Sequence, residues 1–370
     1  MISQKELQKV AKTIIDINLA VKNKELVTIS TGPRSLDFAE ALAYEVSMVG
    51  GQASISYGSD KLSLRIYKNI KSKFLKNKPK LAPILARKVD VGIVIDDSDP
   101  LLARFLPQKK IEIRRKVLKP FREIEERRQL NRKMKAALIG FPTIKDAEAM
   151  KVPFERLSKI FWKTMMVNYD GLYNFNKKLI KKLEKADRIK IIGERTNLEF
   201  SVKNRKFFNA CGIVTKKGEM GYLNLPDGEV FAPPVEDSVN GEIYFDLPCM
   251  YHYGKQVKGI WFKFKNGKLI DYKVEKGLKD FEDIYKNASG DKNKIGELGI
   301  GTNPNAKITG GMIIVDEKVK GTIHMAIGHN KHFGGKNDST IHWDFFKNMK
   351  KKGSRIFVDG KVFMKDGRFV

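Results

Sequence analysis

The first half of the chain alternates short apolar runs with amphipathic segments. Four runs of β-branched and aliphatic residues predict buried strands. They are residues 25–30, 52–57, 89–95 and 136–141. Residues 35–49 have a helical pattern that ends at Gly50-Gly51, which is a typical helix stop. This alternation of strand and helix is typical of a mostly parallel sheet, so we expect an α/β domain over residues 1–150.

The pattern changes after an amphipathic stretch, residues 153–185, which predicts a helical connection over residues 151–186. From Asp187 onward, short alternating segments are separated by turn pairs. These pairs include Asn266-Gly267, Asp359-Gly360 and Asp366-Gly367, and each tolerates the positive φ of a tight hairpin turn. We therefore expect residues 187–370 to form an α+β domain with a mostly antiparallel, barrel-like sheet, which also carries the candidate metal site described below.

Composition narrows the class of protein. The chain has 370 residues with 42% hydrophobic and 10% aromatic side chains, which is enough to bury two cores. No stretch approaches the roughly 20 apolar residues that span a bilayer, and the first residues lack a secretory pattern. Cys211 and Cys249 form no C-x-x-C pair, so we expect two buried, reduced thiols in a cytoplasmic protein.

The net charge of +28 raises the question of a nucleic-acid partner. Basic residues are dense between Lys109 and Lys135, but glutamates such as Glu112 and Glu123 lie among them. This mixture predicts a solvated helix with i,i+4 ion pairs rather than a binding stripe. We therefore do not expect nucleic acid as a specific partner, although a basic binding protein with a vestigial metal site is a third interpretation.

Histidine usage gives the sharpest chemical signal. Four of the five histidines lie within nineteen residues: His324, His329, His332 and His342. His342 and Asp344 are two positions apart, so on a strand they would project from the same face. Imidazole with carboxylate is a ligand mixture that suits zinc, cobalt, manganese or iron. The cluster therefore predicts a metal site.

Two glutamates lie in rigid, apolar settings. Glu229 follows Pro226-Asp227-Gly228, and Glu297 lies between Gly296 and Leu298. A carboxylate among apolar neighbours is costly unless it is paired or bound to metal. Both residues are candidates to join the histidines.

Three segments together resemble the aminopeptidase T / aminopeptidase S family of metallo-aminopeptidases. They are PDGEVFAPPVEDSVNG (residues 226–241), GELGIGTNPNA (296–306), and GTIHMAIGHN with GGKNDSTIHWD (321–330 and 334–344). The resemblance implies a metal-dependent aminopeptidase that uses a metal-activated water to release N-terminal residues from peptides. It also implies two divalent metal ions (zinc, cobalt or magnesium), peptide substrates with a free N-terminus, and a homodimer.

The resemblance also implies the ligands. They are Glu229, Glu297, His324, His342 and Asp344, matched motif by motif. The family has a tyrosine a few residues after the histidine of HxAxG, where this chain has Lys331 and His332, and we expect His332 to replace it. Glu297 is the candidate catalytic carboxylate, because a carboxylate beside the water can take its proton and pass it to the leaving amine.

A second enzyme class uses fewer of these residues. Relatives of this fold include ring-cleaving dioxygenases that hold a single iron with two histidines and an aspartate, which His324, His342 and Asp344 would supply. Such an enzyme has no need of Glu229 and Glu297 as ligands. Because both glutamates are present in their motifs, we favour the peptidase.

Overall fold

The computed structural model describes residues 2–103, 105–216, 221–251 and 255–370. Within them the chain forms two compact units. The first combines the residues up to Met166 with residues 212–226, and the second consists of Val167–Cys211, Asp227–Tyr251 and Lys255–Val370. The chain therefore passes from one unit into the other more than once.

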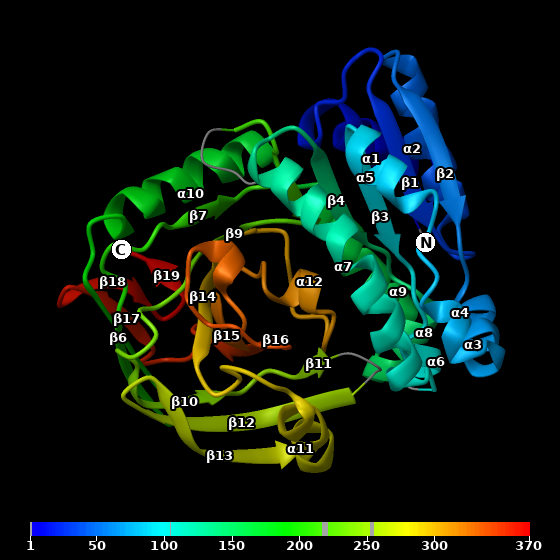
Figure 1. Cartoon of the computed structure of the whole chain (residues 1–370). Coiled ribbons are helices and arrows are strands. Elements are labelled where there is room, and N and C mark those ends of the chain that lie inside the picture. Colours follow the sequence, from blue (N-terminus) through cyan, green and yellow to red (C-terminus); the bar gives the residue numbers. More distant parts are fainter. Residues whose placement is uncertain (1, 104, 217–220, 252–254) are drawn as a thin grey trace. The chain divides into compact units, whose positions relative to one another are not determined.

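The first unit is built on a parallel sheet of five strands in the order β2-β1-β3-β4-β8 (Figure 1). Its strands are β1 (Leu26–Thr31), β2 (Gln52–Tyr57), β3 (Val91–Asp96), β4 (Lys135–Gly140) and β8 (Tyr222–Leu225). The four predicted strands and their parallel pairing are confirmed. The fifth strand differs from expectation, because β8 comes from the predicted antiparallel half and pairs parallel to β4. Its short alternation predicts a strand, but local sequence does not specify the partner strand.

The helices of this unit lie before and between its strands along the chain. They are α1 (Gln4–Thr13), the π-helix η1 (Ile14–Asn18), α2 (Leu36–Met48), α3 (Asp60–Asn69), α4 (Ser72–Leu75), α5 (Ala82–Lys88), α6 (Pro100–Ala103), α7 (Gln108–Leu130), α8 (Ile144–Met150) and α9 (Phe154–Met165). Helix α2 contacts β1 and β2 and buries Phe38, Leu42 and Val46 on one face. The basic segment forms α7 as predicted, and i,i+4 ion pairs such as Lys116–Glu112 lie along it.

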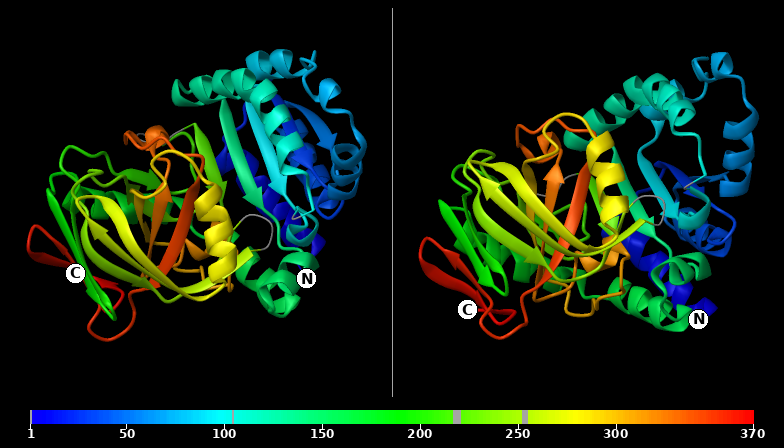
Figure 2. Two further views of the ribbon diagram at one scale, coloured as in Figure 1. Left: turned by 60° about the horizontal axis from the view of Figure 1, so that its bottom comes forward. Right: turned by 90° about the horizontal axis from the view of Figure 1, so that it is seen from below.

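The second unit contains two antiparallel sheets (Figures 1 and 2). The outer sheet has the order β11-β12-β10-β6-β5-β17-β18-β19, with β13 also paired to β12. Its strands are β5 (Arg188–Gly193), β6 (Thr196–Ser201), β10 (Asn240–Phe245), β11 (Cys249–Tyr251), β12 (Lys255–Lys265), β13 (Lys268–Lys276), β17 (Arg355–Val358), β18 (Lys361–Lys365) and β19 (Arg368–Phe369). The turn pairs Asn266-Gly267, Asp359-Gly360 and Asp366-Gly367 each join neighbouring antiparallel strands.

The central sheet has the order β16-β15-β14-β9-β7. Its strands are β7 (Phe208–Ala210), β9 (Glu229–Ala232), β14 (Ile295–Gly301), β15 (Thr322–Gly328) and β16 (His342–Asn348). The predicted antiparallel character of this half is thus confirmed for both sheets. Barrel-like closure stays a prediction.

Helices of the second unit are α10 (Tyr169–Leu183), α11 (Leu278–Asn287), the short α12 (Ile313–Asp316) and the 3-10 turn η2 (Lys331–Phe333). The amphipathic stretch before Asp187 therefore forms two helices, α9 and α10, which belong to different units. Among the helices within the described ranges, none combines the length and apolar content needed to cross a membrane.

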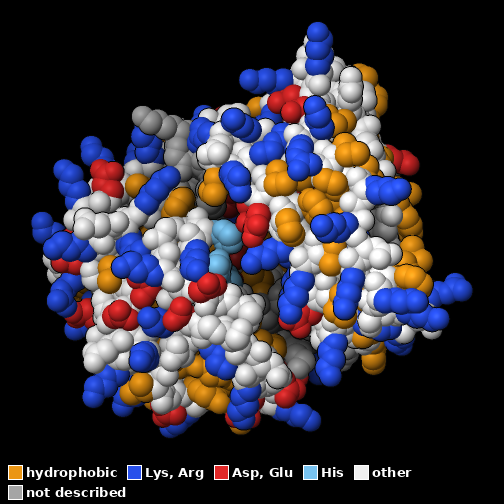
Figure 3. Space-filling model, viewed as in Figure 1, with side chains coloured by type: hydrophobic (Ala, Val, Ile, Leu, Met, Phe, Trp, Pro, Cys, Tyr) orange, Lys and Arg blue, Asp and Glu red, His pale blue; other side chains and the backbone are white. Residues whose placement is uncertain are grey.

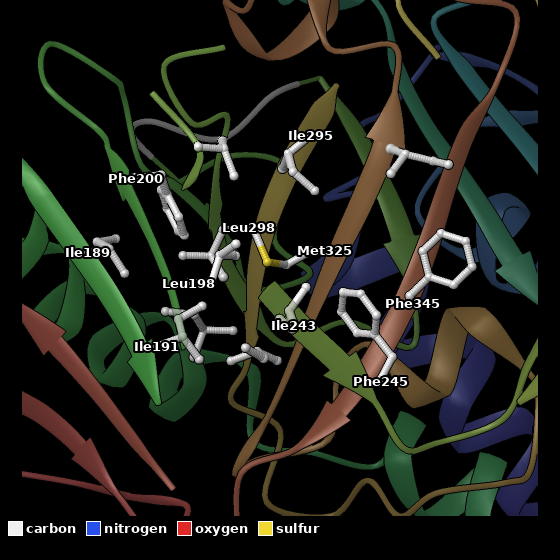
Figure 4. Packing of buried hydrophobic residues seen from close by; sticks show 14 of the residues in the cluster. Ile189, Ile191, Leu198, Phe200, Ile243, Phe245, Ile295, Leu298, Met325 and Phe345 are labelled. Atoms are coloured by element: carbon white, nitrogen blue, oxygen red, sulfur yellow. The ribbon is translucent and has the colours of Figure 1, made fainter. Parts of the chain in front are cut away.

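The core of the second unit lies between the two sheets. Figure 4 shows apolar side chains of the outer sheet (Ile189, Ile191, Leu198, Phe200, Ile243 and Phe245) facing those of the central sheet (Ile295, Leu298, Met325 and Phe345). Strands β14 and β15 are buried at every position, which means that both of their faces are covered. Trp343 is fully buried in this core. Cys211 and Cys249 are buried, as predicted, and neither is in a disulfide.

Candidate metal centre

The five residues matched by motif lie on one face of the central sheet. Side chains alternate between the two faces of a strand. In β15 and β16 the apolar residues Met325 and Phe345 face the core, so His324 and Asp344 face the other side. We call the two sides the core face and the site face, and the site face carries Glu229, Glu297, His324, His342 and Asp344.

A β-bulge sets the position of Glu297. The pairing of β14 with β15 shifts between Ile295 and Glu297, so that Ile295 lies opposite Ile327 and Glu297 lies opposite Ala326. A bulge adds one residue and re-aims the side chain that follows it. Ile295 and Leu298 can therefore both reach the core while Glu297 projects from the site face.

Small residues lie opposite the polar side chains and leave space for them. Across the strands, Glu229 pairs with Gly301, His324 with Gly299, Asp344 with Ala326, and His342 with Gly328. Gly299 shows the reason most directly, because a Cβ at this position would lie 2.0 Å from the imidazole of His324. The glycines in GELGIG thus make room above the sheet for the site.

Glu297 lies at the middle of the cluster. Its Oε1 lies 3.3 Å from Nε2 of His324, and its Oε2 lies 3.4 Å from Nε2 of His342. On the first side, Nε2 of His324 also lies 3.3 Å from Oε2 of Glu229. On the second side, Nε2 of His342 lies 3.6 Å from Oδ1 of Asp344. The Glu297 carboxylate therefore lies between two groups of possible metal ligands. One group is Glu229 with His324, and the other is His342 with Asp344.

His342 is held by a backbone contact. Its Nδ1 donates to the carbonyl of His329 over 2.8 Å, which leaves Nε2 free to point at Glu297 and Asp344. Such a contact on the far ring nitrogen fixes the tautomer and ring orientation of a metal-binding histidine. Thus His329 contributes to the site through its carbonyl group.

Two residues of the cluster come from outside the central sheet. Glu317 and Lys318 follow α12 directly, and Lys318 is fully buried. The Nζ of Lys318 lies 2.6 Å from Glu229 Oε1, 2.9 Å from Glu317 Oε1 and 3.5 Å from Asp227 Oδ1. Glu229, Glu317 and His324 each place one possible ligand atom within 4.8 Å of the others.

Burial and charge shift the pKa values of these groups in different directions. Burial raises the pKa of Glu229, with the Lys318 ammonium opposing it, and burial likewise raises the pKa of Glu317 to about 7. Burial would also raise the pKa of Glu297, but contacts with His324 and His342 bring it down to about 2. Burial opposes the charged form of His324, yet the surrounding carboxylates raise its pKa to about 9. The carboxylates therefore attract positive charge into the site.

The residues fit a metal centre on three grounds. The donors are carboxylate oxygens and imidazole nitrogens, which bind divalent transition metals. Oε2 of Glu229 and Oδ1 of Asp344 are buried and have no hydrogen-bond partner, although buried polar atoms are normally satisfied. Burying several carboxylates together is costly unless cations are present. Bound divalent ions would use these donors, give the two oxygens a partner and offset the buried negative charge.

Glu317 and Lys318 were missed by sequence reasoning. The available signal was the charged triplet Asp316-Glu317-Lys318 directly after the apolar run Met312–Val315. Such a run followed by three charges in a short loop indicates buried charge, but it matches none of the quoted motifs.

In the part of the chain that the structure describes, no hydrogen bond, ion pair or ring contact joins His332 to the five residues of the site face. It is exposed on η2, and within the described residues its ring contact is with His329, at 4.8 Å between ring centroids. The next residue, Phe333, does contact the ring of His342. The role of His332 as a ligand therefore stays a prediction.

The site is open to solvent on the His342 side. The side chain of His342 is 30% exposed, whereas that of His324 is 1% exposed. Figure 3 shows histidine side chains beside acidic ones at the surface, while Lys and Arg side chains are spread over the rest of this view. The His342 side of the cluster is therefore its more accessible side.

Comparisons with known proteins match this chain to a family. Residues 3–369 match a family model described as thermophilic metalloprotease (M29). The match covers nearly the whole chain, and it confirms the resemblance seen in the three motifs.

Curated relatives carry aminopeptidase names. The chain is 27% identical to Aminopeptidase AmpS of Bacillus subtilis (strain 168) over 190 residues, which is 45% of each protein. It is 22% identical to Aminopeptidase T of Thermus thermophilus over 410 aligned positions, which cover 99% of each. The match thus spans less than half of the first relative and almost all of the second.

Solved structures agree on the fold. Wild-type AmpT from Thermus thermophilus superposes with a TM-score of 0.79 at 20% identity, covering 99% of both chains. A 2,5-dihydroxypyridine dioxygenase from Pseudomonas putida KT2440 superposes with a TM-score of 0.63 at 12% identity, covering 100% of this chain and 98% of the other. At such identities the likeness concerns the fold alone.

Proposed function

The chain belongs to the thermophilic metalloprotease (M29) family, and from that premise we propose that it is a metal-dependent aminopeptidase. It would release N-terminal residues from peptides at the site face of the central sheet. The aminopeptidase names of AmpS and Aminopeptidase T support this specificity.

The position of Glu297 is the observation that carries the proposal. Its two oxygens face different histidines, His324 at 3.3 Å and His342 at 3.4 Å. A carboxylate that divides the donors in this way is suited to bridge two divalent ions. Glu229, Glu317 and His324 would hold one ion, and His342 with Asp344 would hold the other.

When bound, two such ions lower the pKa of a water molecule and polarise the carbonyl of the scissile peptide. The residues of the chain supply the rest. Glu297 is also the candidate base, because an oxygen of its carboxylate that is not held by an ion can accept a proton from water and pass it to the leaving amine. Asp344 and the partly exposed His342 lie at the open side, where a free α-amino group would enter.

The dioxygenase alternative makes a different use of the same residues. It needs His324, His342 and Asp344 around one iron, and it gives Glu229 and Glu317 no metal ion to hold. Metal analysis of the purified protein separates the two functions. We expect about two divalent ions per chain, whereas one oxygen-sensitive Fe(II) per chain would favour the dioxygenase.

Alanine variants test the peptidase directly. Glu229→Ala and His342→Ala should abolish hydrolysis of amino-acid p-nitroanilides, because each removes a proposed ligand. His332→Ala is the informative companion, since His332 is exposed and contacts His329. Loss of a metal ion in His332→Ala would support its role as the replacement for the family tyrosine. Full activity in Glu229→Ala or His342→Ala would refute the site.

Three finer points belong to the same proposal. Zinc or cobalt suits the mixed nitrogen and oxygen donors better than magnesium, which favours oxygen ligands. The absence of a disulfide at Cys211 and Cys249 supports a cytoplasmic protein. We also propose a homodimer, and light scattering should then give twice the chain mass of 42.2 kDa.

A further inference from the structure

Lys318 is a buried cation at one end of the metal-binding cluster. Its side chain is 1% exposed. Its Nζ lies 2.6 Å from Oε1 of Glu229 and 2.9 Å from Oε1 of Glu317. An ammonium group has three donors and accepts none, so it occupies the carboxylate oxygens that it contacts.

In Glu229 the oxygen that Lys318 occupies is the one that does not face the histidine. Oε2 of Glu229 lies 3.3 Å from Nε2 of His324 and has no hydrogen-bond partner, while Oε1 is held by Lys318. Each of Glu229 and Glu317 is therefore left with one oxygen for an ion. Without Lys318, either carboxylate would be free to bind through both oxygens.

The backbone fixes Lys318 in this position. Its N–H donates to the carbonyl of Val315, and its own carbonyl accepts from the N–H of Asn303 over 2.9 Å. Asn303 also donates through its side chain to the carbonyl of Asp227. The loop that carries Lys318 is thereby tied to the loop that carries Asp227 and Glu229.

We propose that Lys318 is a positioning residue that restricts Glu229 and Glu317 to one-oxygen ligation and so selects metal ions of low coordination number. The inference rests on the proposed metal site. Ca²⁺ takes six to eight oxygen ligands and uses both oxygens of a carboxylate, whereas Zn²⁺ takes about four ligands. A site whose carboxylates each offer a single oxygen disfavours the larger coordination shell.

The charge of the cluster agrees with this role. Asp227, Glu229, Glu297, Glu317 and Asp344 bring five carboxylates together. The Lys318 ammonium and two divalent ions would balance them. Simple charge balance is the rival explanation for Lys318, and the experiment has to separate it from control of ligation.

A charge-matched double variant makes this separation. Lys318→Met removes the ammonium but leaves an excess negative charge that can prevent folding. Asp227→Asn with Lys318→Met removes one charge of each sign and keeps Glu229 and Glu317. The introduced amide would retain an oxygen to accept the N–H of Gly228, which Asp227 accepts over 2.8 Å. Lys347→Met is the matched control, because Lys347 is also buried but donates to the backbone carbonyls of Glu194 and Tyr244.

The measurements are Co²⁺ binding to the metal-free full chain, the visible absorption of bound Co²⁺, and competition by Ca²⁺. Low-coordinate Co²⁺ absorbs visible light more strongly than six-coordinate Co²⁺. The wild type and Lys347→Met should bind Co²⁺ with strong absorption and resist Ca²⁺. The double variant should absorb more weakly, and Ca²⁺ should compete at least about tenfold better.

Each outcome decides between the explanations. If the double variant keeps the wild-type absorption and the wild-type resistance to Ca²⁺, Lys318 only balances charge and the inference is wrong. The proposed function would still stand after that result, provided that the wild type hydrolyses p-nitroanilides and binds Co²⁺. If the wild type takes up no Co²⁺ at all, the proposed metal site itself fails.

Discussion

The two faces of the central sheet share one backbone and have opposite chemistry. The core face buries Ile300, Met325 and Phe345 against other apolar side chains. The site face buries Glu229 and His324 as fully, but it leaves Glu229 Oε2 and His324 Nδ1 without hydrogen bonds. Burial on the core face stabilises the fold, whereas burial of charge on the site face costs stability until cations arrive.

The two faces therefore differ in what a substitution should change. A change on the core face should lower the free energy of unfolding and spare the ligand set. A neutralising change on the site face should remove activity and leave the metal-free protein at least as stable. Four substitutions test this difference, beginning with the largest expected effect.

Glu229→Gln should separate activity from stability most strongly. The pKa of Glu229 is raised, first by burial, so the ionised form is less favourable in the folded protein than in the unfolded chain. Neutral glutamine removes that cost, and the metal-free variant should unfold at the same temperature as the wild type or higher. Activity should fall by more than about 100-fold, since even outer partners of a metal ligand are worth about 10–100-fold. Thermal unfolding and p-nitroanilide kinetics measure the two effects, and a clearly destabilised variant would contradict this account.

Ile300→Ala tests the opposite face. Ile300 is 1% exposed and packs in the core between the two sheets. Truncating a buried isoleucine to alanine costs about 2–5 kcal/mol, through lost burial and the cavity left behind. Urea unfolding should show this loss, while the folded variant should keep the Co²⁺ affinity of the wild type. Ile300→Val is the mild control, with an expected cost of about 0.5–1.5 kcal/mol.

The sequence predicts the two faces better than it predicts the complete site. In IGELGIG the apolar residues Ile295, Leu298 and Ile300 break strict alternation once, and the structure shows the bulge at that break. The hairpin pairs were likewise visible from local spacing, and the five residues that lie together on the site face were visible from their motifs. Glu317 and Lys318 were not, because a short helix brings them to the sheet through contacts that spacing along the chain does not encode.

The same limit explains other differences. The strand β8 was predicted only as part of the second half, but its partner is β4, which lies more than eighty residues earlier. His332 was predicted as a ligand through the resemblance, and that role stays a prediction, while its ring contacts His329. Local pattern determines which face of an element is buried, whereas the choice of neighbour depends on the whole fold.

Glu317→Gln should give a pH-dependent change in stability. The pKa of Glu317 is raised from 4.5 to about 7, mainly by burial. The folded metal-free protein therefore binds more protons than the unfolded chain between these pH values, and its stability should fall as pH rises through this window. The variant lacks this loss, so its advantage should be small below pH 4.5 and reach at most about 3 kcal/mol above pH 7. Urea unfolding at several pH values measures it, and an advantage that does not vary with pH would contradict the assignment.

Gly299→Ala tests whether the site face depends on empty space as well as on charge. A Cβ at Gly299 would lie 2.0 Å from Cε1 and Nε2 of His324, and this glycine has no positive φ that would add backbone strain. The imidazole would have to move away from Glu229 and Glu297, at a cost of about 1–3 kcal/mol for overpacking. Co²⁺ affinity and the free energy of unfolding should therefore fall together, unlike in Glu229→Gln or Ile300→Ala. Gly58→Ala is the control, because a Cβ there meets nothing within 4 Å. If Gly299→Ala binds Co²⁺ as tightly as Gly58→Ala, His324 does not need the space opposite it, and the small residues across from the ligands have some other cause.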